Sequence, residues 1–385
     1  MIQFVSKRTE GYDHLKKELV PEVIWLRCIA CLAIVAIHCI NLTFTNYEES
    51  LASQTVTLLE VIKLVLLFGT PAFVFISEFL LAKSYSAYIP DKFLWKRARY
   101  ILIPYFTMAV VYAFYSLIRS DELTPYSLVV KILRNIVVAD YIAYFIIVIF
   151  QFYILHIIFT KYFQSLSPKL FIPLCLAINL LYLGFFNFVP PLQFIPGAEY
   201  IWTRLYWVAF PGWLFYFSVA YQCGKNYTAF KEFLNRNIKW IILVPILTFL
   251  AITFLKFTMI LPETNSKRID MLFYALSMIF VIFYFSSKAK RIPWVIDQIS
   301  RYSFGIYLLH LMFVQTISKF FQGLHPFINL PLTFIISISL SIIFTYLLHK
   351  LKIGNYFVGK IGNSFSRTNK ANKQNDSWVE TEIKV

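Results

Sequence analysis

Long apolar runs, separated by short polar segments, fill most of this chain of 385 residues. A helix of about 20 apolar residues is long enough to cross a hydrocarbon core of about 30 Å. The pattern therefore predicts an all-α polytopic membrane protein, a bundle of about ten transmembrane helices. The expected spans are residues 22–44, 57–82, 99–118, 141–160, 169–188, 205–223, 239–260, 271–286, 303–321 and 330–350.

Three further stretches do not fit a membrane span. Residues 126–138 are apolar but carry Lys131 and Arg134, which indicates an interfacial helix. Residues 1–21 form a polar cytoplasmic segment before the transmembrane domain of residues 22–352. The remaining tail, residues 353–385, is polar and expected to be disordered in the cytoplasm.

Composition supports the membrane interpretation, since 59% of the residues are hydrophobic and 19% aromatic, with a mean hydropathy of +0.65. The formal net charge of +16 could suggest a nucleic-acid partner. However, the basic residues gather in alternate loops, as the positive-inside rule requires. We therefore expect the lipid bilayer as the environment, both termini in the cytoplasm and no nucleic-acid partner. The basic stretches lie at residues 7–17, 83–99, 161–169, 225–239 and 288–301.

The first apolar run contains two ionisable residues, Arg27 and His38. A spacing of eleven residues is about three helical turns, so both side chains lie near one face, roughly 16 Å apart along the axis. Ionisable groups inside a span usually face the protein interior and mark a pathway or a reaction centre. A neutral imidazole could take the proton of an attacking hydroxyl as general base. The alternative for His38 is a hydrogen bond to a neighbouring helix.

A second set of cations lies at the start of the third span, in Lys96, Arg97 and Arg99. Such a cluster often only sets the topology, but it also suits a phosphate clamp, helped by the free N–H groups of the helix N-terminus. Arg27, close to the cytoplasmic boundary, could bind the same anion, because a guanidinium matches phosphate bidentately. Equally, Arg27 could only anchor the end of its helix.

Four further polar residues within spans are candidates for a role in the site. Glu78 is expected in a buried polar network, paired with Arg27, Arg97 or His38, or protonated. Gln151 is expected to hydrogen-bond inside the bundle, and Tyr105, which follows a helix-kinking proline, to place its phenol inside. His310 could contact a donor molecule, position the first helix or serve packing alone.

The motifs of several common enzyme classes are absent from the sequence. The sequence contains no phosphate-binding glycine loop, no H-E-x-x-H and no nucleophile elbow. It contains no D-x-D either, which disfavours a metal-dependent sugar-nucleotide glycosyltransferase. Because no cluster of metal ligands occurs in the sequence, we expect no metal centre.

Three motifs together carry a family resemblance. They are R-x10-H from Arg27 to His38, the basic cluster followed by I-L-I-P-Y at residues 101–105, and Y-S-F-G-I-Y-L-L-H at residues 302–310. In this order the chain resembles the acyltransferase 3 family of integral membrane proteins, which O-acylate extracytoplasmic polysaccharides. F-G-T-P-A-F at residues 68–73 and G-W-L-F-Y-F at residues 212–217 resemble the branch associated with poly-N-acetylglucosamine and intercellular adhesion.

The resemblance implies a multi-pass enzyme of the bacterial plasma membrane. It would move an acyl group, acetyl by default, from cytoplasmic acyl-CoA to a hydroxyl of a cell-surface polysaccharide or glycan. Acyl-CoA would be a substrate rather than a resident cofactor. His38 would be the catalytic base, with Arg27 as a second catalytic residue on the same helix face, and the donor would be held by Lys96, Arg97, Arg99 and His310. Two alternatives remain, an exporter of polysaccharide or lipid-linked glycan and a structural partner of a glycan synthase.

Overall fold

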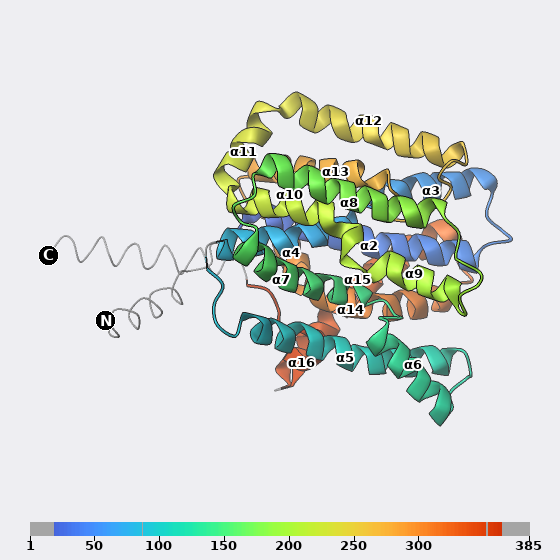
Figure 1. Cartoon of the computed structure of the whole chain (residues 1–385). Coiled ribbons are helices and arrows are strands. Elements are labelled where there is room, and N and C mark those ends of the chain that lie inside the picture. The colour runs from blue at the N-terminus through green and yellow to red at the C-terminus, as the bar shows by residue number, and fades with distance from the viewer. Residues whose placement is uncertain (1–18, 87, 352, 364–385) are drawn as a thin grey trace.

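The computed structural model describes residues 19–86, 88–351 and 353–363 (Figure 1). All regular secondary structure in these residues is helical. The elements are α2 (Pro21–Asn46), α3 (Ser53–Leu66), α4 (Gly69–Tyr85), α5 (Phe93–Arg119), α6 (Pro125–Val137), α7 (Tyr144–Tyr162), α8 (Pro168–Phe188), α9 (Ala198–Val208), η1 (Phe210–Trp213), α10 (Leu214–Lys225), α11 (Tyr227–Arg236), α12 (Ile238–Phe257), α13 (Met271–Ser287), α14 (Trp294–Phe320), α15 (Pro326–Lys350) and α16 (Gly354–Val358).

Seven helical stretches of the described chain are long and apolar enough to cross a membrane. They are Pro21–Asn46, Ser53–Tyr85, Phe93–Arg119, Tyr144–Tyr162, Pro168–Phe188, Ile238–Phe257 and Pro326–Lys350. Met271–Ser287 is apolar but shorter. The prediction of an all-α polytopic membrane protein is confirmed. The interfacial stretch forms α6 as a separate helix, and the first and last segments of the sequence lie largely outside the described residues.

Two expected spans are not single helices. The second divides into α3 and α4 at Leu67 and Phe68, just before Gly69. The sixth, expected as one helix over residues 205–223, is interrupted between α9 and α10. There Ala209 is extended, with ψ of 136°, and Pro211 lies in η1. Proline lacks an N–H and its ring opposes a continuous helix, which gives the physical reason for this correction.

The side chain of Gln151 on α7 satisfies the backbone at the second interruption. Its Nε2 donates to the carbonyl of Val208 at 2.9 Å, and its Oε1 accepts from the N–H of Phe210 at 3.0 Å. Broken backbone at membrane depth needs such partners, because lipid offers none. Gln151 thus lies in a polar network, as expected, and this network supports the fold.

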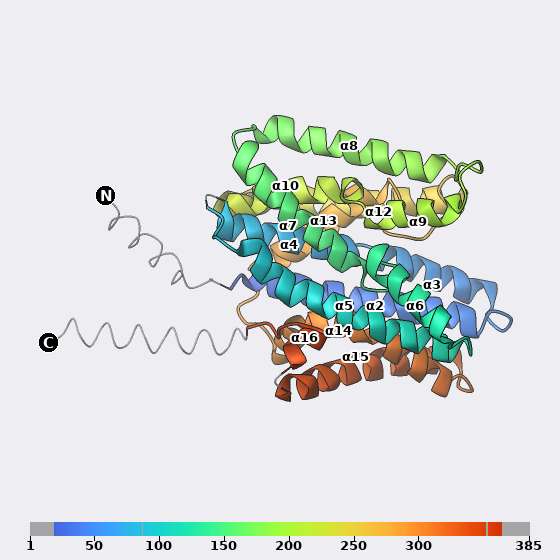
Figure 2. The ribbon, with the colours of Figure 1, turned by 60° about the horizontal axis from the view of Figure 1, so that its bottom comes forward.

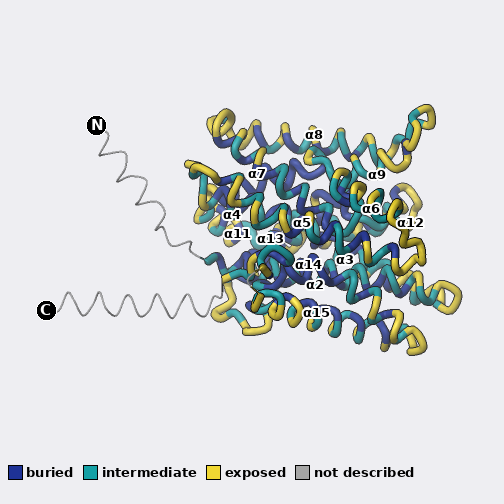
Figure 3. Tube along the Cα trace, turned by 90° about the horizontal axis from the view of Figure 1, so that it is seen from below, coloured by how far each residue is buried: buried dark blue, intermediate teal, exposed yellow. Residues whose placement is uncertain are grey.

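The helices pack around α2 and α14, which lie in the middle of the bundle with about half of their residues buried (Figure 3). α2 packs extensively against α14 and also contacts α4, α13 and α15. α8 and α15 lie at opposite edges (Figure 2). α10 packs closely on α4, since a Cβ at Gly224 would lie 2.3 Å from the carbonyl oxygen of Phe79. Only glycine allows that approach. The bundle therefore surrounds the helix that carries Arg27 and His38.

Candidate active site

A cavity of about 2350 Å³ lies inside the bundle against α2. At the end where α2 and α5 begin, five cations and one carboxylate line it, and we call this the basic mouth: Lys83, Lys96, Arg97, Arg301, Lys360 and Asp91. At the end where α7 begins, Asp140, Arg204 and Thr264 line it, and we call this the paired mouth. The wall between the two mouths includes Arg27 and His38. The cavity therefore joins both ends of the bundle past the first-span motif.

Arg27 lines the cavity without an ion pair or hydrogen bond to any described residue. Arg97 also lines it, with its guanidinium 5.3 Å from the ring centroid of Phe93 and 5.5 Å from that of Tyr153. Tyr153 lies within electrostatic reach of both guanidiniums. Two guanidiniums thus lie near one phenol and lack a described carboxylate partner. Such an arrangement suits an anionic ligand.

The three expected donor-binding cations of α5 do not share one direction. Lys96 and Arg97 line the cavity. Arg99 does not, because its guanidinium donates to the hydroxyl of Tyr356 on α16 and is exposed. Residues two apart on a helix differ by about 200° around its axis. The structure therefore brings Arg97 to the cavity and directs Arg99 toward α16.

His38 lines the cavity on the same helix as Arg27. Its imidazole ring lies 5.2 Å, centroid to centroid, from the ring of His310 on α14. His310 is fully buried and does not line the cavity. The structure thus brings the first-span and late-span motifs together through two imidazoles, with His310 behind His38.

Glu78 has a different partner from those expected. Its Oε1 lies 2.7 Å from Nδ1 of His156 on α7, and both side chains are fully buried. Neither residue lines the cavity. The interaction ties α4 to α7, so the expected buried polar network exists without Arg27, Arg97 or His38. Sequence reasoning gave His156 no role, although a histidine within an apolar span was itself a signal.

Tyr105 also stabilises the wall rather than lining the cavity. Its hydroxyl donates to the carbonyls of Asn135 at 2.6 Å and Ile136 at 3.0 Å, at the end of α6. The ring of Tyr141, which does line the cavity, lies 5.3 Å from that of Tyr105. Tyr105 therefore fixes α6 against α5 beside the paired mouth.

At the paired mouth, cationic side chains contact carboxylates. The Asp140 carboxylate lies 3.4 Å from the Arg204 guanidinium and 3.2 Å from the Lys131 ammonium. Thr264 donates to Glu60 at 2.6 Å, and Glu60 pairs with Lys256 at 2.9 Å. This end therefore combines paired charges with hydroxyl and amide groups.

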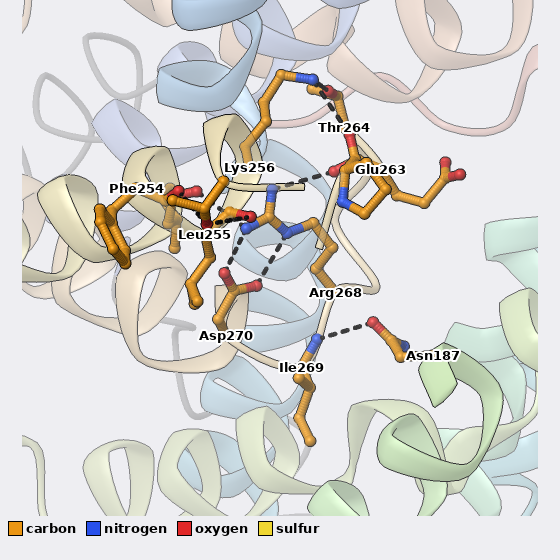
Figure 4. Close-up of polar contacts among 12 residues, drawn as sticks. Asn187, Phe254, Leu255, Lys256, Glu263, Thr264, Arg268, Ile269 and Asp270 are labelled. Carbon is orange, nitrogen blue, oxygen red and sulfur yellow. Dashed lines mark hydrogen bonds and ion pairs between the residues drawn. The ribbon is translucent and has the colours of Figure 1, made fainter. Parts of the chain in front are cut away.

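The segment between α12 and α13 lines part of the paired mouth. Polar contacts around Arg268 hold this segment in place (Figure 4). The buried Arg268 guanidinium pairs with Asp270 and donates to the carbonyls of Glu263, at 3.1 Å, and Ile252, at 2.9 Å. Next to it, the buried ammonium of Lys267 donates to the carbonyl of Gly212 at 2.9 Å. These bonds fix residues 264–266, which line the cavity.

Comparisons with known proteins identify a family and relatives that cover most of the chain. A family model described as an acyltransferase domain matches residues 20–350. The Bacillus subtilis protein YfiQ, named as a membrane-bound acyltransferase, is 36% identical over 354 residues, covering 89% of this chain and 95% of its own length. A Staphylococcus aureus protein named as a poly-beta-1,6-N-acetyl-D-glucosamine export protein is 26% identical over 360 residues, covering 89% and 97%. No solved structure matches the chain significantly.

Proposed function

The chain belongs to the acyltransferase 3 family of membrane acyltransferases, and from that premise we propose an O-acyltransferase acting on a cell-surface glycan. The donor would be cytoplasmic acyl-CoA, with acetyl as the default acyl group. The observation that carries the proposal is the cavity, which connects unpaired guanidiniums to His38 and then to a charge-paired mouth. A donor and an acceptor could therefore meet inside the bundle from opposite ends.

Orientation follows from the distribution of basic residues. We propose ten membrane crossings with both termini in the cytoplasm. The helices α9 and α10 would together form one crossing, as would α3 and α4. The basic mouth would then face the cytoplasm, where acyl-CoA is made, and the paired mouth the cell exterior. Arg27, Lys96 and Arg97 would hold the phosphates of coenzyme A, because these three side chains line that part of the cavity and have no carboxylate partner among the described residues.

The acyl transfer itself would use His38. Its imidazole would take the proton of an acceptor hydroxyl while the hydroxyl oxygen attacks the thioester carbonyl. The carbon–sulfur bond would then break, and the coenzyme A thiolate would leave with a proton returned from the imidazolium. Water-excluding walls would protect the thioester from hydrolysis. The ester formed would remain on the glycan.

The acceptor end has features that suit a sugar. Trp207 and Tyr144 both line the cavity, with ring centroids 5.7 Å apart. Aromatic faces combine a large apolar contact area with little loss of conformational freedom. Asn265 and Ser266 add groups able to hydrogen-bond to hydroxyls. A neutral glycan therefore fits this mouth better than a strongly charged one.

The test compares the ester content of surface polysaccharide in cells with the wild-type protein, with His38→Ala and with the gene deleted. Protein levels in the membrane are matched by immunoblot. We expect esters to be lost in both altered strains while glycan still reaches the surface. Esters that persist in His38→Ala at normal protein levels would remove His38 from the chemistry.

An exporter is the second candidate, because a relative bears that name and the cavity reaches both ends of the bundle. It predicts a different result in the same experiment. Glycan would accumulate inside the cells of the deletion strain, and ester content would not follow His38. A structural partner of a glycan synthase predicts instead that replacing both Arg27 and His38 leaves glycan and esters intact.

A further inference from the structure

The ring of His310 is held in one orientation by its own helix. Its Nδ1 lies 2.9 Å from the carbonyl oxygen of Ile306 and 2.9 Å from that of Tyr307. Carbonyl oxygens only accept hydrogen bonds, so Nδ1 must carry the proton. A neutral His310 therefore has its lone pair on Nε2, an assignment that follows from the hydrogen-bond network.

That Nε2 atom is buried and has no hydrogen-bond partner among the described residues. The side chain as a whole is fully buried. A buried polar atom without a partner costs free energy, so it usually has a partner at some stage of function. The neighbouring ring with an exchangeable N–H is His38, 5.2 Å away between centroids and tilted by 52°.

We propose that His310 is a positioning residue for His38, accepting a hydrogen bond from one imidazole N–H through Nε2. The other nitrogen of His38 then carries the lone pair and faces the cavity as the base. This inference rests on the proposed function. It differs from a direct contact between His310 and the donor, since His310 does not line the cavity.

The hydrogen bond from His38 to His310 would assist His38 as a base in two ways. It selects the tautomer of His38 whose free nitrogen points at the substrate, and it gives the imidazolium formed during transfer a hydrogen-bond acceptor. Catalytic hydrogen bonds are often long before substrate binds, and they tighten when the complex forms. A small rotation of His38 about its side-chain bonds would complete this contact. The proton stays within the pair until the leaving thiolate takes it.

His349 on α15 provides a matched control. Its Nδ1 lies 2.8 Å from the carbonyl oxygen of Thr345, one turn earlier, and its Nε2 is buried and unpartnered among the described residues. It does not line the cavity, and the ring that packs beside His38 belongs to His310. The two histidines thus have similar Nδ1 contacts and an unpartnered Nε2, and they differ in that His310 packs beside His38.

The test measures transfer of labelled acetyl from acetyl-CoA to glycan in membrane vesicles carrying full-length protein. The variants are His310→Leu, His310→Gln and His349→Leu. For His310→Leu we expect kcat to fall by about 10²–10⁴-fold, the contribution of general acid–base catalysis that is lost when the base is wrongly oriented, while KM for acetyl-CoA stays within about twofold. His310→Gln, whose amide oxygen can replace Nε2 as acceptor, should recover at least about tenfold of that loss. His349→Leu should leave both constants unchanged.

Three results would overturn the inference. The first is an unchanged kcat in His310→Leu. The second is a higher KM for acetyl-CoA in that variant with kcat unchanged, which would mean that His310 contacts the donor. The third is an equal loss of kcat in His310→Leu and His310→Gln at matched thermal stability. If His310→Leu fails to accumulate in the membrane, the Gln variant decides alone, with kcat near wild type supporting the inference and kcat at background refuting it. A wild-type protein that transfers no acetyl would instead refute the proposed function.

Discussion

The cationic side chains at the two mouths of the cavity have different kinds of partner. At the basic mouth, Arg97 rests on aromatic rings and Lys360 lies 3.6 Å from the ring centroid of Tyr100, and neither has a described carboxylate partner. At the paired mouth, the Arg204 guanidinium and the Lys131 ammonium both contact Asp140. Both ends carry cations, but Arg204 and Lys131 contact a carboxylate, whereas Arg97 and Lys360 lie against aromatic rings.

This difference separates charges that support the fold from charges that await a ligand. A cation that already has a carboxylate partner gains little from an incoming phosphate, because the pair must first be broken. A guanidinium over an aromatic ring keeps its charge available. We therefore expect the anionic substrate at the basic mouth and an uncharged substrate at the paired mouth.

Among the tests of this comparison, Arg27→Gln should have the largest effect on KM for acetyl-CoA. A hydrogen bond to a charged group contributes about 1.5–3 kcal/mol, so KM for acetyl-CoA should rise by about 10–100-fold. The measurement is acetyl transfer in membrane vesicles over a range of acetyl-CoA concentrations. Arg27→Lys, which keeps the charge but loses the fork geometry, should fall between wild type and Gln. An unchanged KM in Arg27→Gln would leave the residue with a purely anchoring role.

The next test compares two arginines of one helix. Arg97→Gln removes a cation that lines the cavity, and Arg99→Gln removes one that contacts Tyr356 on α16. We expect KM for acetyl-CoA to rise by about tenfold in the first variant and to stay within about twofold in the second, because only Arg97 can reach the donor. Equal effects in the same vesicle assay would mean that the helix end attracts the donor by its overall charge rather than by a cavity contact.

Salt should act unequally on the two substrates. Raising the ionic strength from about 0.05 M to about 0.5 M shortens the range over which charges attract, so KM for acetyl-CoA should rise a few-fold. The apparent affinity for an uncharged glycan should not change. Substrate titrations at both ionic strengths measure this. A matching loss of glycan affinity would contradict the assignment of an uncharged substrate to the paired mouth.

The smallest effect on the donor is expected from Arg204→Gln. Asp140 keeps Lys131 as a partner, so no carboxylate is left unpaired by the change. KM for acetyl-CoA should stay within about twofold, and any change should appear in the dependence of the rate on glycan concentration. Two titrations, one for each substrate, separate these constants. A large rise in KM for acetyl-CoA would mean that part of the donor binds at the paired mouth and not at the basic mouth.

The sequence predicted some of this geometry directly. The spacing of Arg27 and His38 indicated one helix face, and both line one cavity. The different directions of Arg97 and Arg99 also follow from helical geometry, since two positions correspond to about 200°. The expectation that both hold the donor overlooked that angle.

Other features depended on which helices are neighbours, and sequence alone does not give that. Glu78 contacts His156 because α4 packs on α7. The interruption before α10 could be suspected from Pro211, but its stabilising partner, Gln151, lies on another helix. Hydropathy also predicts a span by its length and average, so it joins helices across a short break, as it did at Leu67.

The packing of α2 against α14 has a consequence for how the protein is made. His38 is synthesised about 270 residues before His310, and ribosomes add about 5–20 residues per second. His310 is therefore synthesised on the order of 10–60 s after His38. During that time the first helix must remain in the membrane with ionisable side chains that lack their final neighbours. A nascent chain that stops before α14 would therefore carry His38 without the neighbour that we propose positions it.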